Sequence, residues 1–79
     1  MAITIEEAVD ETGVPKVVQK QILEQETAMW QQTRYRLTVR HRVNKKIGAD
    51  ESVLAALVQE LEQCEKVLDA LSSEMKALA

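Results

Sequence analysis

Residues 51–78 read ESVLAALVQELEQCEKVLDALSSEMKAL. Within this stretch, apolar residues recur at alternating steps of three and four, the heptad spacing of a helix that packs lengthwise against another helix. The row consists of Leu54, Leu57, Leu61, Cys64, Leu68, Leu71, Met75 and Leu78. A row of this length, without interruption, predicts a long helix over about 51–78 whose apolar seam is buried against at least one partner helix.

A second long helix is predicted upstream, over about 15–47. After Pro15, which fits a first helical turn because its missing N–H would have no partner there, no Gly or Pro occurs before Gly48. Gly48 is placed to end this helix and Asp50 to cap the next one. The expected apolar stripe is Val18, Ile22, Met29, Thr33, Leu37 and Ile47, with Glu26, Arg36 and Arg40 within or beside it and Leu23 and Trp30 on one flank. Two long helices joined by a turn at 48–50 should lie antiparallel.

A short helix is expected before the hairpin, over about 4–12. Thr4 and Glu7 have the spacing of a capping box, and Gly13 can adopt the left-handed conformation that ends a helix. The expected fold class is therefore all-α. Residues 1–79 should form a single helical domain, an antiparallel helical hairpin preceded by a short N-terminal helix.

The size of the chain indicates that the hairpin needs a partner. Its 79 residues include one Trp, one Tyr and no Phe, and a chain of this length buries only about 60% of the surface that it exposes when unfolded. The economical solution is a homodimer in which two hairpins form a four-helix bundle. The alternative is a monomer in which the short helix closes a three-helix bundle.

A second row on the upstream helix is the predicted surface for self-association or for another protein. Its residues are Ala28, Tyr35, Val39, Arg42 and Lys46. The row lies about 130° around the helix from the apolar stripe, so one straight partner helix cannot cover both. We therefore expect a small non-enzymatic helical interaction or adaptor protein.

The charges predict an alternative function, because they fall into three blocks. Residues 1–33 hold six acids and two lysines, residues 34–46 hold six bases and no acid, and residues 47–79 hold seven acids and two lysines. The basic segment 34–46 could bind RNA or another nucleic acid through phosphate contacts and stacking on the tyrosine ring. The candidate contacts are Arg34, Tyr35, Arg42, Lys45 and Lys46.

A structural interpretation of the same cations is favoured. The helical period scatters them around most of the helix instead of gathering them on one side. In an antiparallel hairpin they would lie beside the downstream acids Glu60, Glu62 and Glu65. Arg36 and Arg40 are then expected to form ion pairs with Glu62 that fix the register of the two helices.

No feature predicts catalysis. His41, the only histidine, has no nucleophile or carboxylate spaced to meet it on its own helix face, and it is expected to be a solvated surface residue. Cys64 occupies a seam position, where a thiol acts as a small apolar group. Metal-ligand spacings and phosphate-binding glycine motifs are absent from the sequence. We predict no enzyme activity, no cofactor, no metal ligand and no catalytic residue.

A single cysteine rules out an internal disulfide framework and indicates a reducing, cytoplasmic location. The sequence has no apolar run near the roughly 18 residues that cross a bilayer, and no export signal is apparent at its start. A membrane is therefore not an expected partner.

The hairpin with its leucine seam resembles the Rop family in architecture alone. That resemblance implies a two-helix chain that dimerises into a bundle and binds paired RNA loops. The segment from Thr4 to Leu23, with Thr-Gly-Val-Pro between two helices, is similar to the opening of histone-like DNA-binding proteins. The strands and arms of those proteins are missing here, and neither resemblance carries a motif that transfers site residues.

Overall fold

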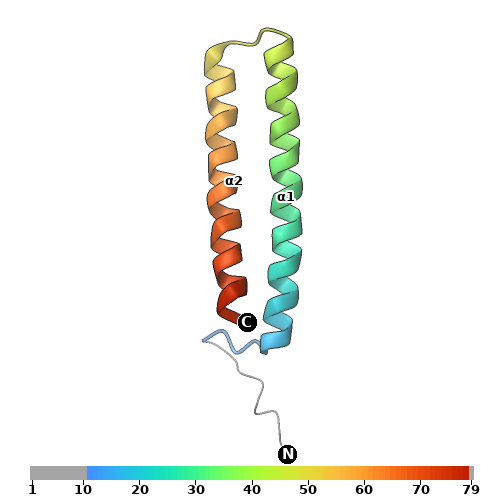
Figure 1. Ribbon diagram of the computed structural model, residues 1–79, viewed down its shortest axis with the longest axis vertical. Helices are drawn as coiled ribbons and strands as arrows, with labels where there is room; N and C mark the ends of the chain where they lie inside the picture. The colour runs from blue at the N-terminus through green and yellow to red at the C-terminus, as the bar shows by residue number, and fades with distance from the viewer. Residues whose placement is uncertain (1–10, 79) are drawn as a thin grey trace, which may run out of the picture.

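The computed structural model describes residues 11–78, which form two antiparallel helices, α1 (Lys16–Lys46) and α2 (Glu51–Leu78), packed side by side (Figure 1). The described part of the chain is thus an all-α helical hairpin. The short helix predicted over about 4–12 falls on residues outside the described range, apart from Glu11 and Thr12, which lie in a turn.

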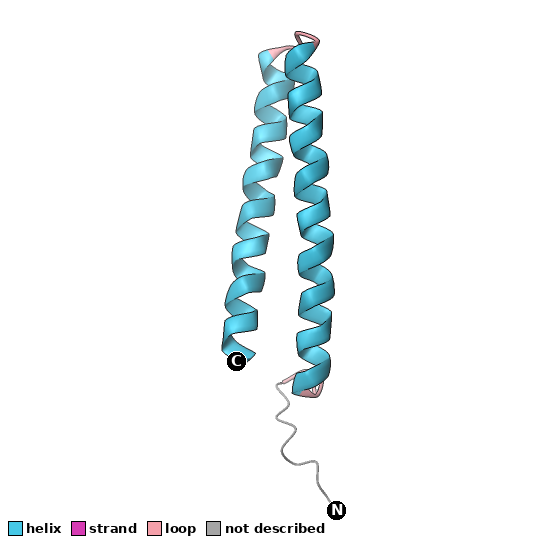
Figure 2. Ribbon diagram, turned by 45° about the vertical axis from the view of Figure 1, so that its right-hand side comes forward, coloured by secondary structure: helices cyan, strands magenta, loops and turns pink. Residues whose placement is uncertain are grey.

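The hairpin is a rod. Its longer helix, α1, has 31 residues and is about 46 Å long, whereas two packed helices are only about 20 Å wide. The two helix axes cross at a shallow angle, as the turned view shows (Figure 2). Such packing brings two helices together along one narrow seam and leaves most of each helix in contact with solvent.

The turn between the helices follows from Gly48. Its φ angle is +75°, a left-handed conformation that costs a residue with a Cβ about 1–2 kcal/mol. The Gly48 N–H donates to the carbonyl of Lys45 at 3.2 Å, and the Ala49 N–H donates to that of Asn44 at 2.9 Å. These two bonds form a Schellman motif, which satisfies the last carbonyl groups of α1. Asp50 follows, and its own carbonyl accepts from the first N–H groups of α2.

The apolar seam predicted for α2 faces α1. All eight of its residues are buried or half-buried, whereas every other described residue of α2 except Val67 is exposed. Leu57 and Cys64 are buried most deeply. Together with Leu37 of α1 they form the core, against which Trp30 and Leu61 pack.

The side of α1 that contacts α2 agrees with the predicted stripe only at Thr33 and Leu37. The contact positions, spaced by three and four and all buried or half-buried, are Gln19, Leu23, Glu26, Trp30, Thr33, Leu37, His41 and Asn44. Val18, Ile22, Met29 and Ile47 are exposed instead. This orientation brings Leu23, Trp30 and Leu37, spaced by seven residues, against the seam of α2. Burying these large side chains outweighs the cost of placing polar residues between them.

Candidate functional site

An ion pair fixes the register of the hairpin. The Arg34 Nη1 atom lies 3.0 Å from the Glu65 Oε2 atom. Both side chains are about half exposed, so this contact contributes at most about 1 kcal/mol. Its value here is geometric, because it shows that α1 and α2 residues whose numbers sum to about 99 lie at the same height.

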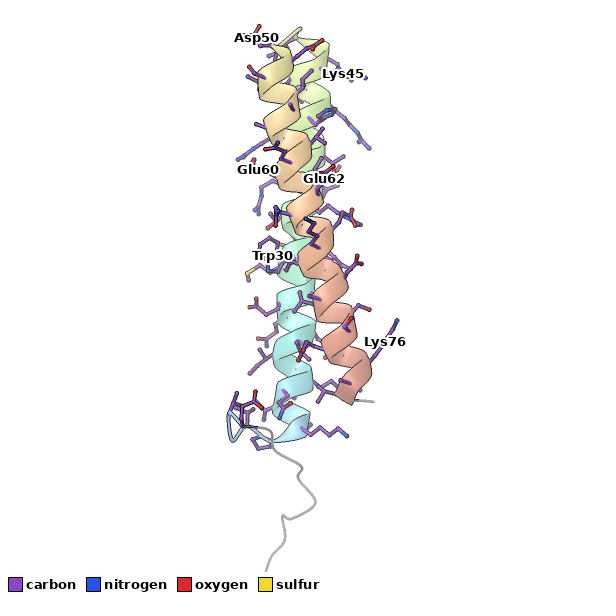
Figure 3. The ribbon with its side chains drawn as sticks, turned by 90° about the vertical axis from the view of Figure 1, so that its left-hand side faces the viewer. Trp30, Lys45, Asp50, Glu60, Glu62 and Lys76 are labelled. Carbon is purple, nitrogen blue, oxygen red and sulfur yellow. The ribbon has the colours of Figure 1, made fainter. Side chains whose placement is uncertain are left out.

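The same ion pair identifies one broad face of the hairpin. Arg34 follows the contact position Thr33, and Glu65 follows Cys64, so residues that follow contact positions on both helices share this face. In Figure 3, the labelled residues Lys45, Glu62 and Lys76 lie on this side. We call it the polar face. It comprises Lys20, Glu24, Thr27, Gln31, Arg34, Thr38, Arg42 and Lys45 of α1 and Ala55, Val58, Glu62, Glu65, Asp69, Ser72 and Lys76 of α2.

A shallow groove runs between the helices on the polar face. Its lining combines polar side chains with Ala28, Leu68 and Met75, and the Arg34–Glu65 ion pair lies in it. The only large apolar residue of this face that is substantially exposed is Val58, among the residues that the structure describes. The polar face therefore has the character of a solvated surface.

The opposite broad face consists of the residues that precede the contact positions, and we call it the apolar face. Its residues are Val18, Ile22, Gln25, Met29, Gln32, Arg36, Arg40 and Val43 of α1 and Val53, Ala56, Glu60, Gln63, Val67, Ala70, Glu74 and Ala77 of α2. A groove at its open end joins Ile22 and Leu23 of α1 to Glu74 of α2 and to Val14. Figure 3 shows Glu60 leaving α2 on this side, away from Glu62.

Exposed apolar side chains are concentrated on this face. Met29 is 52% exposed and Val43 is 49% exposed. Val18, Ile22 and Val53 are further exposed members, and Ile47 continues the row beyond the last turn of α1. Three alanines of α2 lie on the same face, namely Ala56, Ala70 and Ala77, and their small side chains allow another helix to approach closely. The two broad faces of the rod thus differ sharply in polarity.

The row predicted as a partner surface lies on the back of α1, with Arg42 where the back of the helix meets the polar face. Ala28, Tyr35, Arg42 and Lys46 are exposed and Val39 is half-buried. Tyr35 is 66% exposed, and with Ala28 it lines a shallow depression that also includes Gln31, Gln32 and Arg36. The five predicted residues therefore share one side of the rod, and their role in binding stays a prediction.

The expected ion pairs form only in part. Arg34 pairs with Glu65, whereas Glu60 and Glu62 have no cation within 4.0 Å in the described part of the chain. The structure does not bring Arg36 and Arg40 to Glu62, because the arginines lie on the apolar face and Glu62 lies on the polar face. Of the six cations in the basic segment 34–46, five therefore make no ion pair with the described residues; these are Arg36, Arg40, Arg42, Lys45 and Lys46.

The apolar face was missed by sequence reasoning because its members were assigned to the core. Val18, Ile22 and Met29 have the right spacing for a seam with Leu37, but so do Leu23 and Trp30, and Trp30 is the largest side chain of α1. When Leu23 and Trp30 pack against α2, Val18, Ile22 and Met29 are left on one side of the contact surface. The row of alanines on α2 was a further signal, since it marks a side of that helix with little bulk.

Groups suited to catalysis or to metal binding do not converge in the described residues. His41 is half-buried at a contact position of α1, which differs from the expected solvated position, and Cys64 is only 2% exposed. No three His, Cys, Asp or Glu side chains between residues 11 and 78 gather closely enough to hold a metal ion. Neither α1 nor α2 is apolar enough over a sufficient length to cross a membrane.

Comparisons with protein-family models, with curated proteins and with solved structures found no match for this chain, so its function is argued from its own residues.

Proposed function

We propose that this chain is a small, non-enzymatic helical interaction protein that acts as a homodimer, assembled through its apolar face into a four-helix bundle. The observation that carries the proposal is the difference between the two broad faces. Substantially exposed Val, Ile and Met side chains gather on one face, whereas the other exposes mainly charged and amide groups. Exposed apolar side chains that gather on one face of a small protein are typical of a protein–protein interface.

The small core supports a second copy as the occupant. Within residues 11–78, only Leu37, Leu57 and Cys64 are buried apolar residues. A small domain with so few buried side chains gains little free energy from packing and needs stabilisation from outside the chain. Docking two apolar faces would bury Met29, Val43 and Val53 in the centre of a bundle.

The area of the face is also sufficient. A standard protein–protein interface buries about 800 Å² on each partner. The hairpin is about 46 Å long, from the 31 residues of α1, and two helices wide, about 20 Å, so one broad face can supply that area. Cys64, the only cysteine, is a free thiol, which supports a cytoplasmic location for the dimer.

A charge placed on the apolar face tests this proposal. The Met29→Lys substitution would bury an ammonium group without a partner in the dimer, so we expect it to raise the dissociation constant at least tenfold. The matched control is Gln31→Lys, which puts the same side chain on the polar face of the same helix. Sedimentation velocity over a concentration series measures both dissociation constants.

Equal effects of the two substitutions would contradict the proposed interface. Met and Gln have similar helix propensities, so an effect of either variant on α1 itself should be small. Circular dichroism of both variants at high concentration checks that the helices form.

A second candidate function is binding of RNA or another nucleic acid through Arg34, Tyr35, Arg42, Lys45 and Lys46. The specific observation in its favour is that Arg42, Lys45 and Lys46 make no ion pair with the described residues, while the Tyr35 ring is largely exposed on the back of α1. Cations without partners near an exposed aromatic ring can bind phosphates and stack on a base. This surface lies away from the apolar face, so it is compatible with a dimer.

Retention of labelled single-stranded RNA at low salt tests the second candidate. Replacing Arg42 and Lys46 by Ala should abolish retention, whereas replacing Lys16 and Lys20 by Ala, at the other end of the same helix, should leave most of it. Retention by the unaltered chain should fall steeply as salt is raised, because binding to phosphates releases counterions. The absence of retention at low salt would reject this function.

A further inference from the structure

We infer that the two copies dock with both turns at the same end, so that α1 of each copy lies on α2 of its partner. This inference rests on the proposed dimer and names its geometry. Two hairpins that dock through the same face can be related by a two-fold axis along the rod or across it. The first arrangement places α1 on the partner's α2, and the second places α1 on the partner's α1.

Charge complementarity distinguishes the two arrangements. On the apolar face, Arg40 of α1 and Glu60 of α2 lie at about the same height, and neither makes an ion pair within the described part of the hairpin. With the axis along the rod, each residue keeps its height, so Arg40 of each copy comes to the partner's Glu60 and opposite charges meet. Opposite electrostatic potentials that face each other across an interface favour one arrangement of the partners over others.

The arrangement with the axis across the rod lacks this complementarity. The basic segment would then cover the first half of the partner's α1, where Lys16 and Lys20 balance Glu24 and Glu26. The acidic half of α2 would cover residues 66–78, where two lysines likewise balance two acids. Neither contact brings together segments of opposite net charge.

Side-chain sizes on the apolar face favour the same arrangement. Residues whose numbers sum to about 99 lie at one height, so Ile22, Met29 and Val43 each meet an alanine of the partner's α2. Met29 meets the partner's Ala70, and Val43 meets the partner's Ala56. Large side chains opposite small ones pack two helices without voids. Arg40, which makes no ion pair within the hairpin, comes to the height of the partner's Glu60.

The distance between the two turns tests the inference. A spin label on a cysteine replacing Lys46, on the back of α1 near the turn, should give an intermolecular distance of about 20–30 Å by pulsed electron resonance if the turns share one end. With the turns at opposite ends the distance approaches the length of α1, which is about 46 Å for its 31 residues. A label on a cysteine replacing Gln31, near mid-height, gives a short distance in both arrangements and serves as the control. Cys64 is buried, and mass spectrometry checks that it stays unlabelled.

A charge exchange between two chains provides a second test. Arg40→Glu and Glu60→Arg should each weaken the dimer, because like charges then meet across the interface. Mixing the two variants should restore a dimer, since every contact between positions 40 and 60 then joins opposite charges. Mixing should have no such effect if α1 lies on the partner's α1.

The outcomes separate this inference from the proposed function. A dimer with a long distance between turns, and no restoration on mixing, overturns the inference and leaves the homodimer standing. A monomer under all conditions removes both.

Discussion

The side of the helix on which an apolar residue lies decides how much it contributes to stability. Leu57 and Val58 are neighbours on α2, but Leu57 is 8% exposed in the core beside Leu37, whereas Val58 lies 40% exposed on the polar face. A buried leucine loses its packing contacts and leaves a cavity when it is truncated. The same truncation on the surface removes little that water does not replace.

We therefore expect Leu57→Ala to lower the free energy of unfolding by about 2–5 kcal/mol, a large share of a small domain's total. Val58→Ala should change it by about 0.5 kcal/mol or less. Urea unfolding of both variants, followed by circular dichroism at one chain concentration, makes the comparison. Similar losses in the two variants would show that the seam of α2 is not the core.

At the scale of whole elements, α2 could be predicted in detail from the sequence and α1 only in outline. Every seam position of α2 is occupied by Leu, Met or Cys, so a single face satisfies the helical period. The contact positions of α1 alternate between apolar residues and polar ones, among them Gln19 and Glu26. Two stripes of similar strength then compete, and only packing against α2, through Leu23 and Trp30, decides between them.

The apolar face and the ion-pair register could not be predicted for the same reason. A rotation of α1 by one residue moves Val18 and Met29 from the core to the surface, and it places Arg34 instead of Arg36 beside an acid of α2. The height of the residues was nevertheless close to the expected one. An antiparallel turn centred near Ala49 predicts that the numbers of two residues at the same height sum to about 98. For the Arg34–Glu65 pair the sum is 99.

The mixed seam of α1 predicts a stabilising substitution. Glu26 is half-buried at a contact position and makes no hydrogen bond or ion pair with the described residues. Glu26→Leu should raise the free energy of unfolding by about 1 kcal/mol, because it adds apolar area to the seam without changing helix propensity appreciably. Glu24→Leu, on the polar face, is the control and should give no comparable gain. A stability unchanged by Glu26→Leu would place position 26 outside the contact surface.

The whole molecule is a rod with two unlike broad faces, and this asymmetry is the basis for the functional proposal. One face, with the Arg34–Glu65 pair, is suited to solvent, and the other exposes Met29 and Val43. A third surface, the back of α1 with Tyr35, stays available to another partner when two copies dock. A dimer would thus complete the small core and also present two copies of the basic segment 34–46.

The central claim is that the chain associates with itself. Sedimentation equilibrium at micromolar concentrations should give a mass of about 18 kDa, twice the 8.9 kDa of the chain, at neutral pH and moderate salt. A mass of 8.9 kDa throughout the concentration range, with the helices intact by circular dichroism, would contradict the account.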